Sequence, residues 1–270
     1  MDLKDLAVHL DSGARAAERT RLALALARRH GARLTGLFAE SPTLGASIVG
    51  RRSPDAVARA AEEARARFEA ACGEAGVPSR FWRLDAEREV AGVIDAVVSL
   101  CRRVDLAVFG QQRGDPAPVP DGLVERVIAE SGRPVIVIPS AGSYRDVGRR
   151  VLVAWSGSRE SARALHDALP ILERAERVSV LALLSPGEGA PGRDQPAALV
   201  EHLGTHGVAA AYDRWVVGDF PAVDVVLNRI SDEAADLAVV GAWGLGGVVD
   251  RQGTTRVILE TMTAPVLLSS

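Results

Sequence analysis

Short apolar runs alternate with longer amphipathic stretches along the whole chain. In the first half the apolar runs predict strands at residues 5–10, 33–39, 80–85, 105–109 and 134–138, and the amphipathic stretches predict helices at 14–29, 54–75, 89–102 and 122–131. The second half repeats the pattern, with strands expected at 151–155, 177–184, 210–217, 236–240 and 265–269 and helices at 159–174, 195–206, 221–234 and 254–262. Several predicted strands, such as VLVAW at 151–155, are apolar at every position, which is typical of parallel strands covered by helices on both faces.

Two segments recur at the same interval of 131 residues. DLAVFG at 105–110 corresponds to DLAVVG at 236–241, and GRPVIVIP at 132–139 corresponds to TAPVLLSS at 263–270. A repeat of this kind indicates two domains of one architecture. We therefore predict an α/β fold of two tandem doubly wound domains, each with a mostly parallel five-stranded sheet, over residues 1–142 and 148–270. The small, polar segment SAGSYRDVG at 140–148 is the expected joint.

Composition and charge narrow the classes of function. The chain has 270 residues, of which 47% are hydrophobic and 25% charged, as in an ordinary soluble globular protein. No apolar run approaches the roughly 20 residues that a membrane helix needs. The N-terminus lacks the basic start and apolar stretch of a secretion signal, so we expect a cytoplasmic protein without a membrane partner. A net charge of −3 argues against a nucleic-acid partner.

The candidate chemistry lies in two loops of the second half. In open parallel sheets, ligands bind beyond the carboxyl ends of the strands, where the strand order reverses. The loops after the first and fourth strands are SGS at 156–158 and GAWGLGGVVDRQGTT at 241–255. The glycines of the second loop would let the backbone approach a phosphate at the start of the next helix, and Thr254 would add a hydroxyl. Thr254 is equally a good helix cap without a ligand, so a phosphate cradle and a plain turn both stay open.

The combination of these features resembles the universal stress protein family. It comprises the tandem α/β halves, the small turn after the first strand, and a Gly-x-x-Gly followed some nine residues later by Gly-Ser/Thr, here Gly241, Gly244, Gly253 and Thr254. The resemblance implies an adenine nucleotide alpha hydrolase-like fold in each half. It also implies that the halves pack as a pseudo-dimer through their last strands, PVIVI and PVLLS. In the ATP-binding branch of the family, the glycine elements hold ribose and phosphates. Carried over to the second half, the implied nucleotide site consists of Trp155, Ser156, Leu183, Val240, Gly241, Gly244, Gly253, Thr254 and Thr255.

The two halves depart from the family pattern in different ways. In the second half, Ser156 stands where the ATP-binding branch has an Asp that holds the adenosine, and the two glycine elements are one residue closer together than in the family. The first half keeps an Asp at that position, Asp11, but Leu123 follows Gly122 where a Ser or Thr hydroxyl is expected. We therefore expect a degenerate first half that supports the fold, and nucleotide binding in the second half.

Two other sets of residues suggest rival sites. Ser156 lies on a strand-to-helix turn, as the nucleophile of many hydrolases does, but the Gly-x-Ser-x-Gly pattern of that turn is not met. His202 and His206 are four residues apart on a predicted helix and could share a metal ion. The HExxH glutamate is absent between them, so a solvated helix end is the favoured interpretation.

The sequence thus predicts a stress-response protein that binds ATP or a related adenine nucleotide in its C-terminal domain. Hydrolysis is expected to be slow or absent, because no general base, arginine finger or set of metal-binding carboxylates aligns as phosphoryl transfer requires. We assign no catalytic residue and no metal ligand, and expect Mg²⁺ only with bound ATP. Two alternatives stay open: a nucleotide-free interaction module acting on unidentified protein partners, and a small-molecule hydrolase. A homodimer is also left open.

Overall fold

The chain divides into two compact units, Asp2–Arg145 and Asp146–Ser270. A computed structural model describes residues 2–40, 53–84, 90–112, 119–184, 195–216, 221–243 and 253–270. The division falls inside the segment at 140–148 that the sequence indicates as the joint. How the two units pack, including the expected contact between their last strands, stays a prediction.

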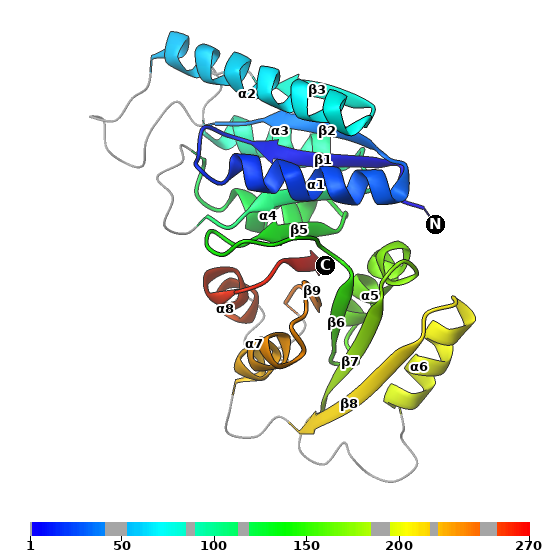
Figure 1. Ribbon diagram of the computed structural model, residues 1–270. Helices are drawn as coiled ribbons and strands as arrows, with labels where there is room; N and C mark the ends of the chain where they lie inside the picture. Colours follow the sequence, from blue (N-terminus) through cyan, green and yellow to red (C-terminus); the bar gives the residue numbers. More distant parts are fainter. Residues whose placement is uncertain are drawn as a thin grey trace. The chain divides into compact units, whose positions relative to one another are not determined.

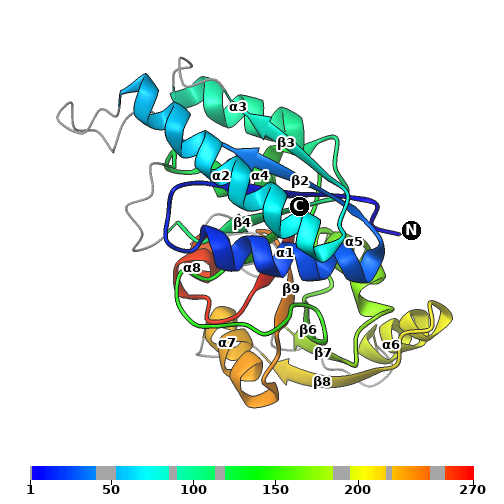
Figure 2. The same ribbon diagram turned by 45° about the horizontal axis from the view of Figure 1, so that its top comes forward.

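The N-terminal unit alternates strands and helices throughout (Figure 1). Its elements in chain order are β1 (Asp5–Leu10), α1 (Ala16–His30), β2 (Arg33–Phe38), α2 (Pro54–Ala75), β3 (Ser79–Arg83), α3 (Val90–Cys101), β4 (Leu106–Gly110), α4 (Leu123–Glu130) and β5 (Val135–Ile138). The strands lie in the order β3-β2-β1-β4-β5 and all neighbours are parallel. Helix α1 packs against α2 and helix α3 against α4 (Figure 2). In the strand order β3-β2-β1-β4-β5, successive strands are added on one side of β1 up to β3 and on its other side from β4 onward, so the order reverses between β1 and β4.

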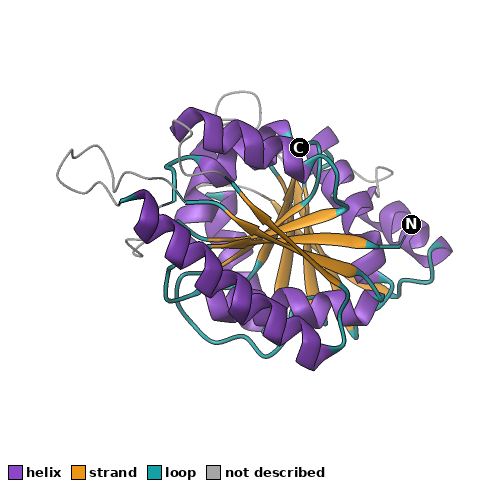
Figure 3. Cartoon of the chain, turned by 90° about the horizontal axis from the view of Figure 1, so that it is seen from above, coloured by secondary structure: helices purple, strands orange, loops and turns teal. Residues whose placement is uncertain are grey.

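The C-terminal unit repeats this architecture. Its elements are β6 (Arg150–Trp155), α5 (Arg159–Leu172), β7 (Arg177–Leu184), α6 (Gln195–Thr205), β8 (Ala210–Val216), α7 (Ala222–Glu233), β9 (Leu237–Gly241), α8 (Gly253–Thr261) and β10 (Val266–Ser269). The strands lie in the order β10-β9-β6-β7-β8, again all parallel. Figure 3 shows helices on both sides of the strands. The fold predicted from the apolar pattern is confirmed, and each predicted element agrees with the structure to within two residues at either end.

One aspartate in each copy of the repeated DLAV segment ties the unit together. The Asp105 carboxylate accepts hydrogen bonds from the backbone N–H groups of Lys4 (2.8 Å) and Asp5 (2.9 Å), where β1 begins. The Asp236 carboxylate accepts from the N–H groups of Gly148 (2.8 Å) and Arg149 (2.9 Å), where β6 begins. The repeated aspartate therefore satisfies backbone donors at the start of the central strand in both units.

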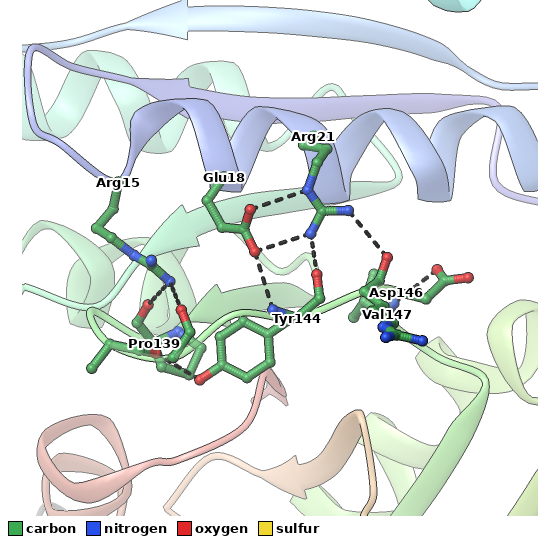
Figure 4. A network of polar contacts seen from close by, with 10 residues as sticks. Arg15, Glu18, Arg21, Pro139, Tyr144, Asp146 and Val147 are labelled. Carbon is green, nitrogen blue, oxygen red and sulfur yellow. Dashed lines mark hydrogen bonds and ion pairs between the residues drawn. The ribbon is translucent and has the colours of Figure 1, made fainter.

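The segment that follows β5 is bound along helix α1 (Figure 4). Arg15 donates to the carbonyl oxygen of Gly142 at 2.8 Å, and Arg21 donates to that of Tyr144. The Tyr144 N–H in turn donates to the Glu18 carboxylate at 3.1 Å. The first part of the expected joint is therefore held by the charged side chains of one helix, and it belongs to the N-terminal unit.

Candidate functional site

Each unit has one point where its strand order reverses, between β1 and β4 in the N-terminal unit and between β6 and β9 in the C-terminal unit. Ligands of doubly wound folds bind at the carboxyl ends of the strands at such a point. In the C-terminal unit Ala154 pairs with Val240, so the turn at Ser156 and the end of β9 at Gly241 lie side by side. The structure thus brings together these two parts of the predicted site.

In the C-terminal unit the turn after β6 forms the cap of helix α5. Ser158 is the N-cap residue, and its Oγ accepts a hydrogen bond from the Ser161 N–H at 3.1 Å. The Ser156 hydroxyl lies 3.0 Å from the same oxygen. The serine that replaces the expected aspartate is therefore part of a hydroxyl chain at the positive end of a helix.

Gly241 is required by the approach of helix α5. A Cβ atom added to Gly241 would lie 2.4 Å from the Ser161 nitrogen and 2.5 Å from the Glu160 carbonyl carbon. Both are backbone atoms, so they cannot turn aside as a side chain could. The sequence pattern suggests a ligand contact at this glycine, whereas the structure shows a close packing of helix on strand that requires glycine without any ligand.

Thr255 connects the loop after β9 to the first turn of helix α8. Its side chain is buried, and its Oγ1 accepts a hydrogen bond from the Trp243 N–H at 2.6 Å. Trp243 has a φ of 60°, a left-handed conformation that is uncommon for a bulky residue. The Thr255 hydroxyl thus helps to hold Trp243 in that conformation, and its proton and one lone pair are left for a ligand.

The remaining residues of the predicted site differ in their surroundings. Leu183 and Val240 are buried positions of β7 and β9. Trp155 is half-buried, and within the described part of the chain its indole Nε1–H is buried without a hydrogen-bond partner. Gly253 and Thr254 begin helix α8, but their surroundings lie outside the description. Gly244 lies outside the described residues altogether.

In the N-terminal unit a guanidinium group fills the corresponding crevice. Arg19 of helix α1 is buried, and it donates to the Asp11 carboxylate at 2.7 Å and to the carbonyl oxygen of His9 at 2.6 Å. Its third nitrogen lies 2.4 Å from the position that a Cβ of Gly110 would take. Arg19 therefore spans the gap between the ends of β1 and β4. Burial raises the pKa of the Asp11 carboxyl, but Arg19, His9 and the Gly13 N–H outweigh burial and hold that pKa below its usual value.

The rest of this crevice is small. The His9 ring stacks on Phe109 with centroids 5.3 Å apart, and its Nε2 lies 2.9 Å from the carbonyl oxygen of Ala39. Burial lowers the pKa of His9 to about 4, so the imidazole is neutral at pH 7 and donates its Nε2–H to that oxygen. The remaining cavity beside Arg19 has a volume of about 80 Å³. Pockets for drug-sized ligands have volumes of roughly 300 to 1,000 Å³, so this cavity is small for a nucleotide. A second cavity of the unit, of about 580 Å³, extends from Asp11 and Gly13 to Phe68 of α2.

Comparison with solved structures identifies the fold. The chain is similar over its whole length (100%) to a universal stress protein from Archaeoglobus fulgidus DSM 4304, with 97% of that chain covered, a TM-score of 0.71 and 17% identity. A protein of unknown function from Pseudomonas aeruginosa PAO1 matches 99% of the chain over 92% of its own length, with a TM-score of 0.62 and 15% identity. The chain has the universal stress protein fold. No protein-family model matches the sequence, and no curated protein does.

Within this universal stress protein fold, the two crevices of the chain differ at one position that the sequence interpretation did not use. Arg19 lies eight residues after Asp11, and Ala164 lies eight residues after Ser156 in the other unit. Both are buried on the inner face of their helices. An arginine among the apolar positions of an amphipathic helix is the signal in the sequence, because a buried arginine needs a partner.

No helix in the described part of the chain is long and apolar enough to cross a membrane.

Proposed function

We propose that this chain is a tandem universal stress protein whose C-terminal unit binds an adenine nucleotide, with ATP as the candidate ligand. One observation supports this choice of unit. Arg19 and Asp11 fill the crevice of the N-terminal unit with an ion pair, whereas Ala164 stands at the position of Arg19 in the C-terminal unit. The class of ligand follows from the resemblance of Gly241, Gly244, Gly253 and Thr254 to the glycine elements of the ATP-binding branch, on a fold that the chain shares with a universal stress protein.

The described groups at the carboxyl ends of β6 and β9 suit a nucleotide. The N-termini of helices α5 and α8 supply the positive ends of two helix dipoles, which favour phosphate. The Ser156 hydroxyl can form a hydrogen bond with a ribose hydroxyl. The Trp155 Nε1–H, which has no hydrogen-bond acceptor among the described residues, can donate to a ligand atom. Without the aspartate, we expect an affinity in the micromolar range or weaker.

Hydrolysis of the bound nucleotide is expected to be slow or absent. Phosphoryl transfer requires groups that hold Mg²⁺, orient the attacking water and stabilise the charge of the transition state. The described side chains of the proposed site supply hydroxyl and indole groups, and those of Ser156 and Thr255 already bond to protein atoms. Mg²⁺ would accompany ATP through the phosphates and need not be held by the chain.

A calorimetric titration of ATP into the wild type, Gly244→Val and Arg113→Val tests the proposal. Residue 113 is the counterpart of residue 244 in the first half, so the second variant is a matched control. We expect Gly244→Val to lose binding and Arg113→Val to keep it. Loss of binding in Arg113→Val alone would place the site in the N-terminal unit, and the absence of heat in the wild type would exclude nucleotide binding.

A protein-interaction module is the second candidate, favoured by the surface of strand β8. This strand pairs with β7, and it exposes Tyr212 and Val216 on one face and Trp215 on the other. Exposed apolar side chains on a sheet-edge strand are typical of a docking site for another protein. If ATP produces no heat in the wild type, this surface becomes the leading functional candidate, and binding of partners should be lost in Trp215→Ser.

A further inference from the structure

Three histidines gather in the C-terminal unit, one in helix α5, one in helix α6 and one just after the end of α6. The ring of His202 in helix α6 lies 5.4 Å from that of His166 in helix α5, and 4.9 Å from that of His206, measured between ring centroids. The whole chain has only five histidines. His202 thus contacts one imidazole four residues ahead on its own segment and another on the neighbouring helix.

The separations of the His202 ring from the other two rings are those of histidines sharing one metal ion. A zinc–nitrogen bond of about 2.0–2.1 Å places the ring centroid roughly 3 Å from the metal, so two ligands at a tetrahedral angle have centroids roughly 5 Å apart. The two observed separations, 5.4 Å and 4.9 Å, are close to this value. Histidines at positions i and i+4 also lie on one face of a helix, as in zinc-binding helices.

One nitrogen of the cluster lacks a hydrogen-bond partner. Among the described residues, Nε2 of His202 is a buried side-chain atom without any partner. A buried polar atom left unpaired costs free energy, and coordination by a metal would remove that cost. His166 and His206 are exposed, so a metal ion can reach the cluster from solvent.

The rings must turn before they can bind a metal together. At present they pack edge to face, with interplanar angles of 68° and 73°. No group of three histidines, cysteines or carboxylates within the described ranges is already arranged around a metal position. Exposed side chains change rotamer in picoseconds to nanoseconds, so turning His166 and His206 is not a kinetic obstacle.

We propose that His166, His202 and His206 form an inducible binding site for a divalent late transition metal such as Zn²⁺. Imidazole nitrogens suit Zn²⁺, Cu²⁺ and Ni²⁺, whereas Mg²⁺ prefers oxygen ligands. Helix α6 runs from the carboxyl end of β7 towards the start of β8, so its histidine-bearing end lies at the opposite side of the unit from the candidate nucleotide site. The metal site is therefore independent of the proposed nucleotide binding, and it would link α5 to α6.

The test is a calorimetric titration of ZnCl₂ into the untagged full chain at pH 7.5. We expect one Zn²⁺ per chain with a dissociation constant in the micromolar range or below, and no heat with MgCl₂. His166→Gln, His202→Gln and His206→Gln should each weaken binding at least about tenfold, because each removes one ligand. Glu201→Gln is the matched control on the same helix turn, and it should bind Zn²⁺ as the wild type does.

Two further measurements separate metal binding from damage to the fold. The far-ultraviolet circular dichroism of each variant should match the wild type, and the same concentration of Zn²⁺ should raise the melting temperature of the wild type and of Glu201→Gln by more than that of the three histidine variants. The absence of Zn²⁺ binding in the wild type would overturn the proposal. Unchanged affinity in His166→Gln would also overturn it, since the site would then be an ordinary pair of histidines on one helix.

Discussion

Arg19 places a guanidinium group among the apolar side chains of the N-terminal unit, where it bonds to Asp11 and to the backbone of His9. A buried ion pair adds little net stability over a well-packed apolar pair, because both charges lose their hydration. Removing one partner is different, since the other charge then stays buried and unpaired. Replacing only one member of the pair should therefore destabilise the fold much more than replacing both.

We expect Arg19→Met to lower the free energy of unfolding by about 3 to 5 kcal/mol, because the Asp11 carboxylate loses its buried partner. The double variant Arg19→Met/Asp11→Asn should recover a large part of this loss, since neither member of the pair is then left with an unpaired buried charge. Urea unfolding of the wild type, both single variants and the double variant measures the coupling. Additive effects of the two substitutions would show that the ion pair does not hold the crevice together.

His9 makes stability depend on pH in a predictable direction. Burial lowers the pKa of its imidazole from 6.5 to about 4 in the folded chain. Between these two values the unfolded chain binds a proton that the folded chain does not, so the free energy of unfolding falls as the pH falls. The full difference corresponds to roughly 3 kcal/mol. Urea unfolding at pH 7 and pH 4.5 should show a larger loss in the wild type than in His9→Gln, and equal losses would contradict the burial of a neutral imidazole.

Gly241→Ala should destabilise the C-terminal unit by about 1 to 3 kcal/mol, because the new Cβ would overlap the backbone of helix α5. Gly73→Ala in helix α2 is the control, since an added Cβ there meets nothing within 4 Å. That substitution should be neutral or stabilise by about 0.5 to 1 kcal/mol through the helix preference of alanine. Thermal unfolding of both variants measures the difference, and an equal loss of melting temperature in Gly73→Ala would show that overlap with helix α5 is not the cause.

At the scale of elements, helix α1 acts as the support of the segment that follows β5. The side chains of Arg15, Glu18 and Arg21 contact this segment along successive turns of the helix (Figure 4). Hydrogen bonds to charged groups contribute more than neutral ones, about 1.5 to 3 kcal/mol each. Local opening of the segment is therefore opposed by one face of one helix.

Arg21→Ala should make the chain about tenfold more sensitive to trypsin after Arg145. Arg21 donates to the carbonyl oxygens of both Tyr144 and Arg145, and cleavage requires this backbone to detach. Arg28→Ala, an exposed position on the same helix, is the matched control. Mass spectrometry of the early fragments identifies the cut, and equal cleavage of the two variants would mean that the segment is held by other contacts.

At the scale of the whole molecule, the fold was predictable because parallel strands covered on both faces are apolar throughout and the repeat shows the pattern twice. The site was less predictable. The sequence pattern predicts a ligand contact at Gly241. In the structure, glycine is required there because the backbone of Ser161 lies so close, and a single sequence does not show how closely a helix approaches a strand. The partner of Arg19 likewise depends on which side chains meet across β1 and β4. Such contacts between distant residues leave no periodic signal in a single sequence.

The buried pair of Arg19 and Asp11 also bears on how the two halves can diverge over generations. Once a duplicated unit has closed its crevice with its own ion pair, a substitution of either residue alone passes through a destabilised protein, because one charge is left without its partner. Proteins tolerate only a few kcal/mol of such loss before they fall below the stability that function requires. Selection for stability therefore preserves the ion pair in the N-terminal copy, and under the proposed function the C-terminal copy is the one on which selection for binding acts.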